Sequence, residues 1–95
     1  MTLSVPVEMR PRSGGVFAGM VVNATAEGLS VLNELRLPPA ERVFLRIRAR
    51  PGARDHVLQA TVLRTVTVDA GIWNRLTVFR LLESGVDLMI ELRDA

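Results

Sequence analysis

The 95-residue sequence contains no cysteine and a single histidine, His56. Without thiols the chain can form neither a disulfide framework nor a thiolate metal site, and one imidazole leaves few other ways of ligating a metal ion. We therefore expect no metal site. Lysine is also absent, so all 12 basic residues are arginine, whose planar guanidinium matches phosphate and guanine edges better than an ammonium does. This bias toward arginine fits either the binding of phosphate or guanine groups or a codon preference.

No apolar run approaches the length of about 18 residues that a membrane-spanning helix needs, and the N-terminus has no basic segment followed by an apolar stretch. These absences favour a cytoplasmic protein without a membrane span. Hydrophobic residues make up 48% and charged residues 23%, which is typical of a folded domain rather than a disordered chain. Because a chain of this length has room for one modest core, we expect a single domain over residues 1–95.

Alternation of apolar and polar residues dominates the sequence, as in Leu3, Val5, Val7 and Met9, and it is typical of half-buried strands. Glycine and proline separate the alternating segments, and no crossover helix lies between them. An all-β, antiparallel structure is therefore favoured over a parallel α/β fold. Six strands are expected, at residues 3–11, 16–22, 29–32, 42–50, 57–68 and 72–82.

Six short strands can close their hydrogen-bonding edges in an antiparallel barrel or sandwich. The last segment, residues 84–92, fits two structures. Its apolar residues alternate like those of a strand, whereas Ser84 followed by Asp87 resembles a helix N-terminal capping box. We favour a short C-terminal helix.

The segment from Asn23 to Gly28 interrupts the alternation. The side chains of Asn23 and Thr25 can bond backbone groups two residues on, and Gly28 can take a positive φ that other residues avoid, so the segment predicts a tight turn. The same residues could bind a nucleotide, because a carboxamide beside exposed backbone amides can read a purine edge and approach a phosphate. Both interpretations stay open at this point.

Four segments together resemble the PilZ domain family, and the resemblance runs from Val5 to about Leu92. Residues 5–10, VPVEMR, resemble its first strand, and Asn23-x-Thr25-x-x-Gly28 resembles its Asp/Asn-x-Ser-x-x-Gly signature. Residues 37–43, LPPAERV, resemble the segment that begins a later strand, and Val78-Phe79 resembles part of the last strand.

This resemblance implies a six-stranded, antiparallel PilZ-like β-barrel with a short C-terminal helix, which receives the bacterial second messenger cyclic di-GMP. Cyclic di-GMP is then the possible ligand, and Asn23 and Thr25, with Gly28, would contact guanine and phosphate. The family also uses an upstream Arg-x-x-x-Arg pair to clamp phosphates and guanine edges. The chain departs from the pattern here, because no Arg-x-x-x-Arg precedes the first expected strand.

Arg10 and Arg12 are the arginines nearest to that position. A hairpin closed by the glycines after Arg12 would pair positions whose numbers sum to about 28, so that Arg10 faces Ala18 and Val5 faces Asn23. Both arginines would then lie about 16 to 23 Å from Asn23, beyond the reach of about 7 Å of their side chains. Either the chain is part of a longer protein or the clamp is lost, and loss should lower the affinity for cyclic di-GMP sharply.

A second feature is an arginine-rich segment in the fourth expected strand. Its period of two places Arg42, Phe44, Arg46, Arg48 and Arg50 on one side. Because neighbouring like charges repel, this side is expected to face solvent, carboxylates on a neighbouring strand, an acidic protein partner or nucleic acid. Nucleic acid is disfavoured, since one tryptophan and three phenylalanines offer few platforms for base stacking.

No catalytic residues are expected. His56 lies at the start of an expected strand, and no serine or acid stands at a recognisable catalytic spacing, so we interpret it as a surface residue rather than a general base. Trp73 and Phe79 share one side of the last expected strand and are interpreted as core residues.

The leading hypothesis is therefore a non-enzymatic, PilZ-like regulatory or adaptor module of cyclic di-GMP signalling. It would act by binding another protein and would bind cyclic di-GMP weakly or not at all. A first alternative is a genuine cyclic di-GMP receptor whose arginines come from an upstream segment or another subunit. A second alternative is an arginine-faced barrel that binds nucleic acid.

Overall fold

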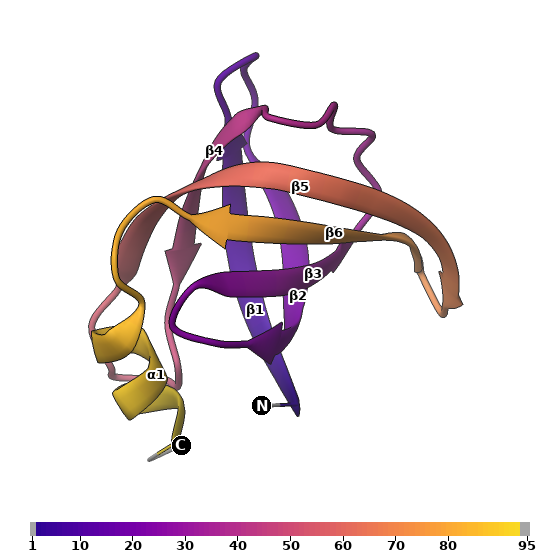
Figure 1. Ribbon diagram of the computed structural model, residues 1–95. Helices are drawn as coiled ribbons and strands as arrows, with labels where there is room; N and C mark the ends of the chain where they lie inside the picture. The colour runs from indigo at the N-terminus through magenta and orange to yellow at the C-terminus, as the bar shows by residue number, and fades with distance from the viewer. Residues whose placement is uncertain (1, 94–95) are drawn as a thin grey trace.

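The computed structural model describes residues 2–93 as a closed antiparallel barrel of six strands followed by one helix (Figure 1). The order of the strands around the barrel is β1-β2-β3-β6-β5-β4. This confirms the all-β fold with a short C-terminal helix expected from the sequence. The elements are β1 (Thr2–Pro11), β2 (Phe17–Ala24), β3 (Gly28–Asn33), β4 (Arg42–Ile47), β5 (His56–Ala70), β6 (Trp73–Leu81) and α1 (Val86–Arg93).

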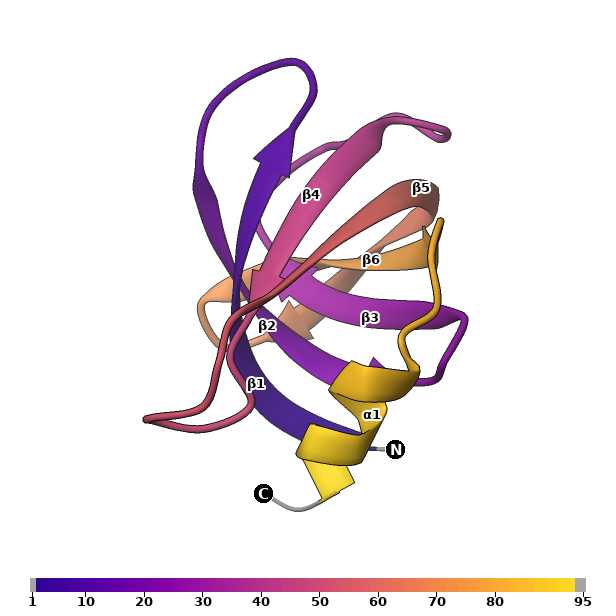
Figure 2. The same cartoon turned by 90° about the vertical axis from the view of Figure 1, so that its left-hand side faces the viewer.

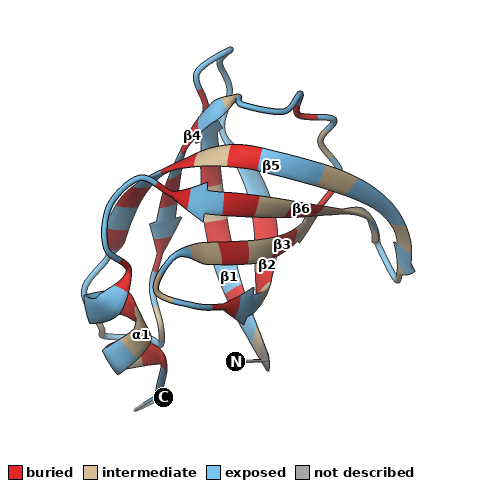
Figure 3. Ribbon diagram, viewed as in Figure 1, coloured by how far each residue is buried: buried red, intermediate tan, exposed pale blue. Residues whose placement is uncertain are grey.

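Buried residues alternate with exposed ones along the strands, as the banding in Figure 3 shows. The inward side chains fill the barrel, so the sequence pattern of period two becomes a single core. Phe79 is the largest side chain at its centre and is fully buried, as predicted. The other largest fully buried hydrophobic side chains are Met9, Leu29, Leu45, Ile47, Leu88, Val21, Val31, Val43 and Val62.

The register of the first hairpin differs from the prediction. Ala18 lies opposite Glu8 and not opposite Arg10, because the connection is longer than the sequence suggested. Gly14 and Gly15 both have positive φ, 114° and 89°, and carry the chain through a wide loop before β2 begins. Arg10 therefore lies even farther from the end of β2 than the predicted register would place it.

The predicted pairing of Val5 with Asn23 is also wrong. Val5 lies opposite Val21, and Thr2 lies opposite Asn23, with an irregularity in the register between Thr2 and Val5. A second irregularity falls between Val21 and Asn23 where β2 pairs with β3. Such bulges add a residue to one strand and cannot be read from alternation alone. The beginning of β1 nevertheless lies beside Asn23, as expected.

Strand ends differ from the prediction at two places that matter for the candidate sites. β2 continues to Ala24, so Asn23 belongs to the strand and not to the turn. β4 ends at Ile47 instead of continuing to Arg50, because the chain turns at Gly52, where φ is +83°. Arg48 and Arg50 therefore lie on a loop.

Trp73 is only partly buried and so is not the core residue that was predicted. It pairs with Ala70 at the tip of the β5–β6 hairpin, which extends past the barrel at the right of Figure 1. A residue at that position keeps the inward parity of its strand but has no opposite wall to pack against. The sequence period gives the face of a residue and not its distance from the core.

Helix α1 packs beside one end of the barrel through Leu88 and Leu92, which are 1% and 4% exposed (Figure 2). Its N-terminus is capped by Ser84, whose Oγ accepts a hydrogen bond from the Val86 amide at 3.3 Å. The expected helix is thus confirmed, although the cap uses Ser84 without the expected contribution of Asp87.

His56 fastens this helix to the barrel and is not the surface residue that was predicted. Its side chain is only 7% exposed, and Nε2 lies 2.8 Å from Oε2 of Glu91 in α1. Arg54 Nε adds a contact of 3.3 Å to the other oxygen of the same carboxylate. The partner of His56 is 35 residues away in sequence, so no local pattern reveals this pair.

The hydrogen bond with His56 lowers the pKa of the Glu91 carboxyl below its ordinary value of 4.5. Burial opposes this shift, whereas attraction to the charges of His56 and Arg54 adds to it. A lowered pKa in the folded chain means that ionised Glu91 stabilises the fold above pH 4.5 and that this contribution is lost as the pH falls through the folded value.

Replacing Glu91 with glutamine keeps the size of the side chain and removes its charge. We expect the wild-type chain to be more stable than Glu91→Gln at about pH 7, and the difference in unfolding free energy to shrink as the pH falls to about 3. Urea unfolding followed by circular dichroism at several pH values measures this difference.

Asp87→Asn is the matched control, because Asp87 lies on the same helix with a side chain that is 78% exposed and only a 3.8 Å contact to Arg54. The difference in unfolding free energy between Asp87→Asn and wild type should change little with pH. A Glu91→Gln difference that stayed constant over the whole pH range would contradict the assigned pairing.

Candidate functional site

The turn between β2 and β3 is held by Thr25. The Thr25 amide donates to the Gly28 carbonyl at 2.9 Å and closes the turn. The Thr25 hydroxyl oxygen accepts from the amides of Gly28 at 3.1 Å and Glu27 at 3.4 Å. Threonine therefore satisfies backbone groups that would otherwise need water, as the sequence predicted for a turn.

Gly28 is required for a different reason from the one predicted. It is absent from the residues with positive φ within the described chain, which are Ala40, Gly14, Gly15, Gly52 and Gly71. A Cβ at Gly28 would instead lie 2.7 Å from the Phe79 carbonyl oxygen, which is a backbone atom and cannot move aside. Glycine here permits the close approach of β3 to β6.

The turn also bonds to the other end of the chain. The carbonyl of Glu27 accepts a hydrogen bond from the Leu81 amide at 2.8 Å, and that of Ala26 accepts one from the Gly85 amide at 3.0 Å. Leu81 ends β6, and Gly85 directly precedes α1. The middle of the signature therefore joins the last strand and the helix to the β2–β3 hairpin.

All three predicted ligand-binding residues, Asn23, Thr25 and Gly28, line a shallow cavity of about 390 Å³. Asn23 is exposed at the end of β2. The cavity continues over the outer faces of β3 and β6, and its other lining residues are Ala24, Glu27, Leu29, Ser30, Leu63, Val78, Phe79 and Arg80.

Arg80 was missed by the sequence analysis. It lies directly opposite Gly28 in the β3–β6 pairing, so a cation stands next to the signature. The only sequence signal is that Arg80 shares the outward parity of Val78 in β6. Its proximity to Gly28 depends on a pairing between strands distant in sequence.

The predicted partner-binding arginines divide into two groups. Arg46, Arg48 and Arg50 line a groove of about 970 Å³ between β1, the start of β2 and the loop after β4, and we call this the arginine groove. Arg42, at the other end of β4, does not line it. The other lining residues are Ser4, Val5, Pro6, Val7, Glu8, Val16, Phe17, Ala18, Ala49, Pro51 and Asp55.

The arginines of the groove differ in their contacts. Arg48 Nε pairs with Asp55 at 2.9 Å, and Arg50 Nη1 donates to the carbonyl of Glu91 at 3.3 Å. Arg46 forms no ion pair within residues 2–93 and lies between the groove and a smaller hollow that contains exposed Phe44. The groove therefore combines a cation that is accessible to a partner with apolar surface.

Within the described residues, no three His, Asp or Glu side chains come close enough together to hold a metal ion. None of the helical segments in residues 2–93 is long and apolar enough to cross a membrane. His56, the only imidazole, is occupied by Glu91 as described above.

No protein-family model and no curated protein matches this sequence. Its fold does match solved structures. The inhibitor of motility MotI/DgrA of Bacillus subtilis superposes with a TM-score of 0.77 at 20% identity over 98% of this chain and 46% of that one, so this chain spans about half its length.

Two PilZ domains also match. The PilZ domain of CeSA from a cellulose-synthesizing bacterium gives a TM-score of 0.66 at 18% identity over 97% of this chain and 88% of that one. The PilZ domain of YcgR from Escherichia coli, solved with cyclic di-GMP, gives a TM-score of 0.66 at 14% identity over 95% of this chain and 75% of that one. The chain therefore has a PilZ-like fold, as the resemblance implied.

The structure predicts that Thr25 stabilises the fold through its hydroxyl. Thr25→Val keeps the shape and removes both accepted hydrogen bonds, so we expect a loss of about 1 kcal/mol in unfolding free energy in urea titrations. Thr25→Ser keeps the hydroxyl, so its unfolding free energy should stay within about 0.5 kcal/mol of that of wild type. Equal losses in the two variants would show that the methyl group, and not the hydroxyl, matters.

Proposed function

We propose that this chain is a non-enzymatic regulatory module of cyclic di-GMP signalling that acts by binding an acidic protein partner. In this proposal it binds cyclic di-GMP itself weakly or not at all. The likeness of the fold to three solved structures, one of them determined with cyclic di-GMP, supports the signalling assignment. Asn23, Thr25 and Gly28, which lie in the β2–β3 turn and the strand ends beside it, line a cavity, as a ligand site would require.

The arginine groove is the observation that carries the adaptor role. It is larger than the cavity at the turn, about 970 Å³ against about 390 Å³. Exposed Phe17 and the accessible guanidinium of Arg46 supply the apolar and cationic contacts that are enriched in protein interfaces. Positive charge at the groove favours a partner with carboxylates at its surface.

The position of the N-terminal arginines supports weak ligand binding. Thr2 lies opposite Asn23, and Arg10 lies eight residues farther along the same strand, at about 26 Å. An arginine side chain spans about 7 Å, so Arg10 and Arg12 lie too far away to clamp a ligand held by Asn23. No catalytic step belongs to the proposal, since the single histidine of the chain serves to hold α1.

Calorimetric titration with cyclic di-GMP tests the ligand part of the proposal. We expect a dissociation constant above about 1 μM or no heat of binding, because the chain lacks the paired arginines that would each contribute a charge-assisted contact. Submicromolar binding that is lost in Asn23→Ala would contradict the proposal and support a genuine receptor.

A synthetic peptide with several glutamates flanking one phenylalanine tests the groove. We expect fluorescence anisotropy to detect binding that weakens with salt and that Arg46→Glu lowers about tenfold. Arg36→Glu, an exposed arginine outside the groove, is the control and should bind as wild type does. Equal binding by both variants would contradict the groove as the site, and tighter binding of single-stranded DNA than of the peptide would favour the nucleic-acid alternative.

A further inference from the structure

The outer face of β2, β3, β6 and β5 places two arginines next to the signature. Residues that pair across neighbouring strands of a sheet point to the same side, so the pairing defines rows on this face. One row contains Asn23, Ser30, Val78 and Arg64, and the next contains Gly28, Arg80 and Thr61. The signature therefore shares its face with a guanidinium from β5 and another from β6.

The spacing of these rows suits a ligand larger than a single phosphate. Neighbouring strands lie about 4.8 Å apart, and alternate residues on a strand about 6.8 Å apart, so the Cα atoms of Asn23 and Arg80 are separated by about 12 Å. An arginine side chain covers about 7 Å of that distance. The residues that line the cavity include Val78 and Leu63, whose apolar side chains suit the face of a purine.

Both guanidiniums are accessible to an anion. Arg64 and Arg80 are exposed, and the guanidinium of neither takes part in a hydrogen bond or ion pair within residues 2–93. By contrast, Arg10, Arg48 and Arg54 are paired with carboxylates. A phosphate at this face would therefore displace no existing contact of either arginine.

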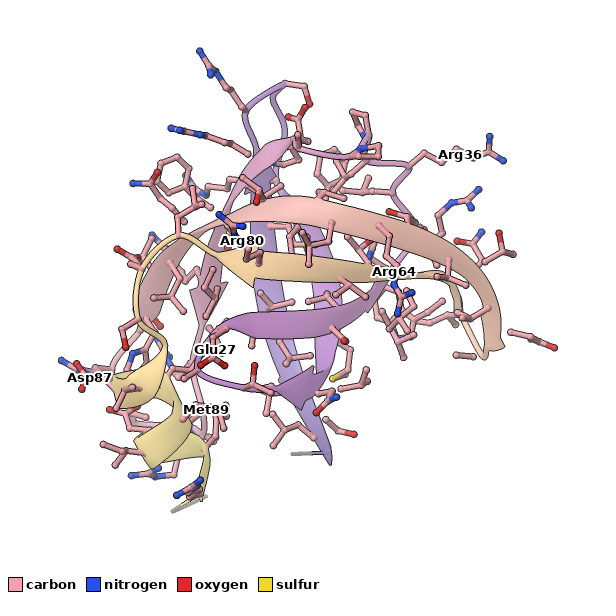
Figure 4. All side chains as sticks on the ribbon, viewed as in Figure 1. Glu27, Arg36, Arg64, Arg80, Asp87 and Met89 are labelled. Carbon is pink, nitrogen blue, oxygen red and sulfur yellow. The ribbon has the colours of Figure 1, made fainter. Side chains whose placement is uncertain are left out.

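Figure 4 shows Arg80 to the left and Arg64 to the right on the face formed by β3, β5 and β6, with Glu27 beside the start of β3. Glu27 is the only carboxylate among the residues that line the cavity, and it forms no ion pair in the described chain. Its charge opposes an anionic ligand, which lowers affinity without closing the site.

We infer that Arg80, assisted by Arg64, binds the phosphates of a cyclic dinucleotide whose base is held at Asn23, and that the last two strands thus supply positive charge to the ligand. This inference rests on the proposed function and sharpens it: ligand binding is weak but present. Guanidinium forks match the paired oxygens of a phosphodiester, and Asn23 can read a purine edge.

Titration of the whole chain with cyclic di-GMP at low salt tests the inference. We expect a dissociation constant of about 10 to 500 μM for wild type, about tenfold weaker binding for Arg80→Ala and about threefold weaker binding for Arg64→Ala. Glu27→Gln should tighten binding about two- to fivefold, because it removes a like charge from the cavity. All three residues are exposed, and circular dichroism of each variant verifies its fold.

Arg36→Ala is the matched control, since Arg36 is an exposed arginine on the loop between β3 and β4 and does not line the cavity. It should bind as wild type does. Binding that Arg80→Ala leaves unchanged, or the absence of binding at millimolar ligand, would overturn the inference. Neither result would contradict the proposed adaptor role, which only submicromolar, Asn23-dependent binding contradicts.

Discussion

Two peptide carbonyls in the β2–β3 turn join the last strand and the C-terminal helix to the first half of the barrel. The carbonyls of Ala26 and Glu27 accept hydrogen bonds from Gly85 and Leu81, so the turn fixes the end of the last strand and the start of the helix. The Thr25 hydroxyl accepts from the Gly28 amide within the turn, and the missing side chain of Gly28 allows β3 to lie against the Phe79 backbone. The signature is thus a structural joint as well as a candidate binding site.

Much of the fold could be predicted from the sequence, because the alternation of apolar residues and the glycine turns are local signals. The six strands and the burial of Phe79 followed from them, whereas the C-terminal helix was favoured by the capping pattern at Ser84 against an alternation like that of a strand. The failures concern contacts between distant segments. His56 was predicted to lie at the surface, and this was wrong. Its partner, Glu91, is 35 residues away on α1, so no local pattern indicates that the imidazole is buried. The position of Arg80 beside Gly28 depends on strand pairing that periodicity does not encode.

The reason for Gly28 was mistaken on the same ground. A glycine in a turn suggests positive φ, yet the constraint is the carbonyl of a strand far along the chain. In the first hairpin the glycines do have positive φ, but they form a wider loop than predicted. The register of Arg10 therefore differs from the prediction. Local patterns predicted which residues form the turns and faces, and long-range backbone contacts decided what those residues do.

The two candidate surfaces centre on opposite walls of the barrel, although both include β2, whose start lines the groove and whose end carries Asn23. β1 and β6 are separated by two strands in both directions around the closed order, so the arginine groove and the face of Arg80 can be occupied at the same time. The segment that contains α1 and the residue before it bonds to the turn and to the groove. Gly85, directly before α1, bonds to the turn, and the carbonyl of Glu91 near the end of α1 accepts from Arg50 of the groove.

Amide hydrogen exchange in wild type and Thr25→Val tests most directly whether the turn is this joint. Loss of the hydroxyl should raise the exchange rates of the Leu81 and Gly85 amides together with that of Gly28. The Arg12 amide, bonded to the Arg42 carbonyl at 2.9 Å in another part of the barrel, should keep its rate. Faster exchange at Gly28 alone, with Leu81 and Gly85 unchanged, would contradict the account.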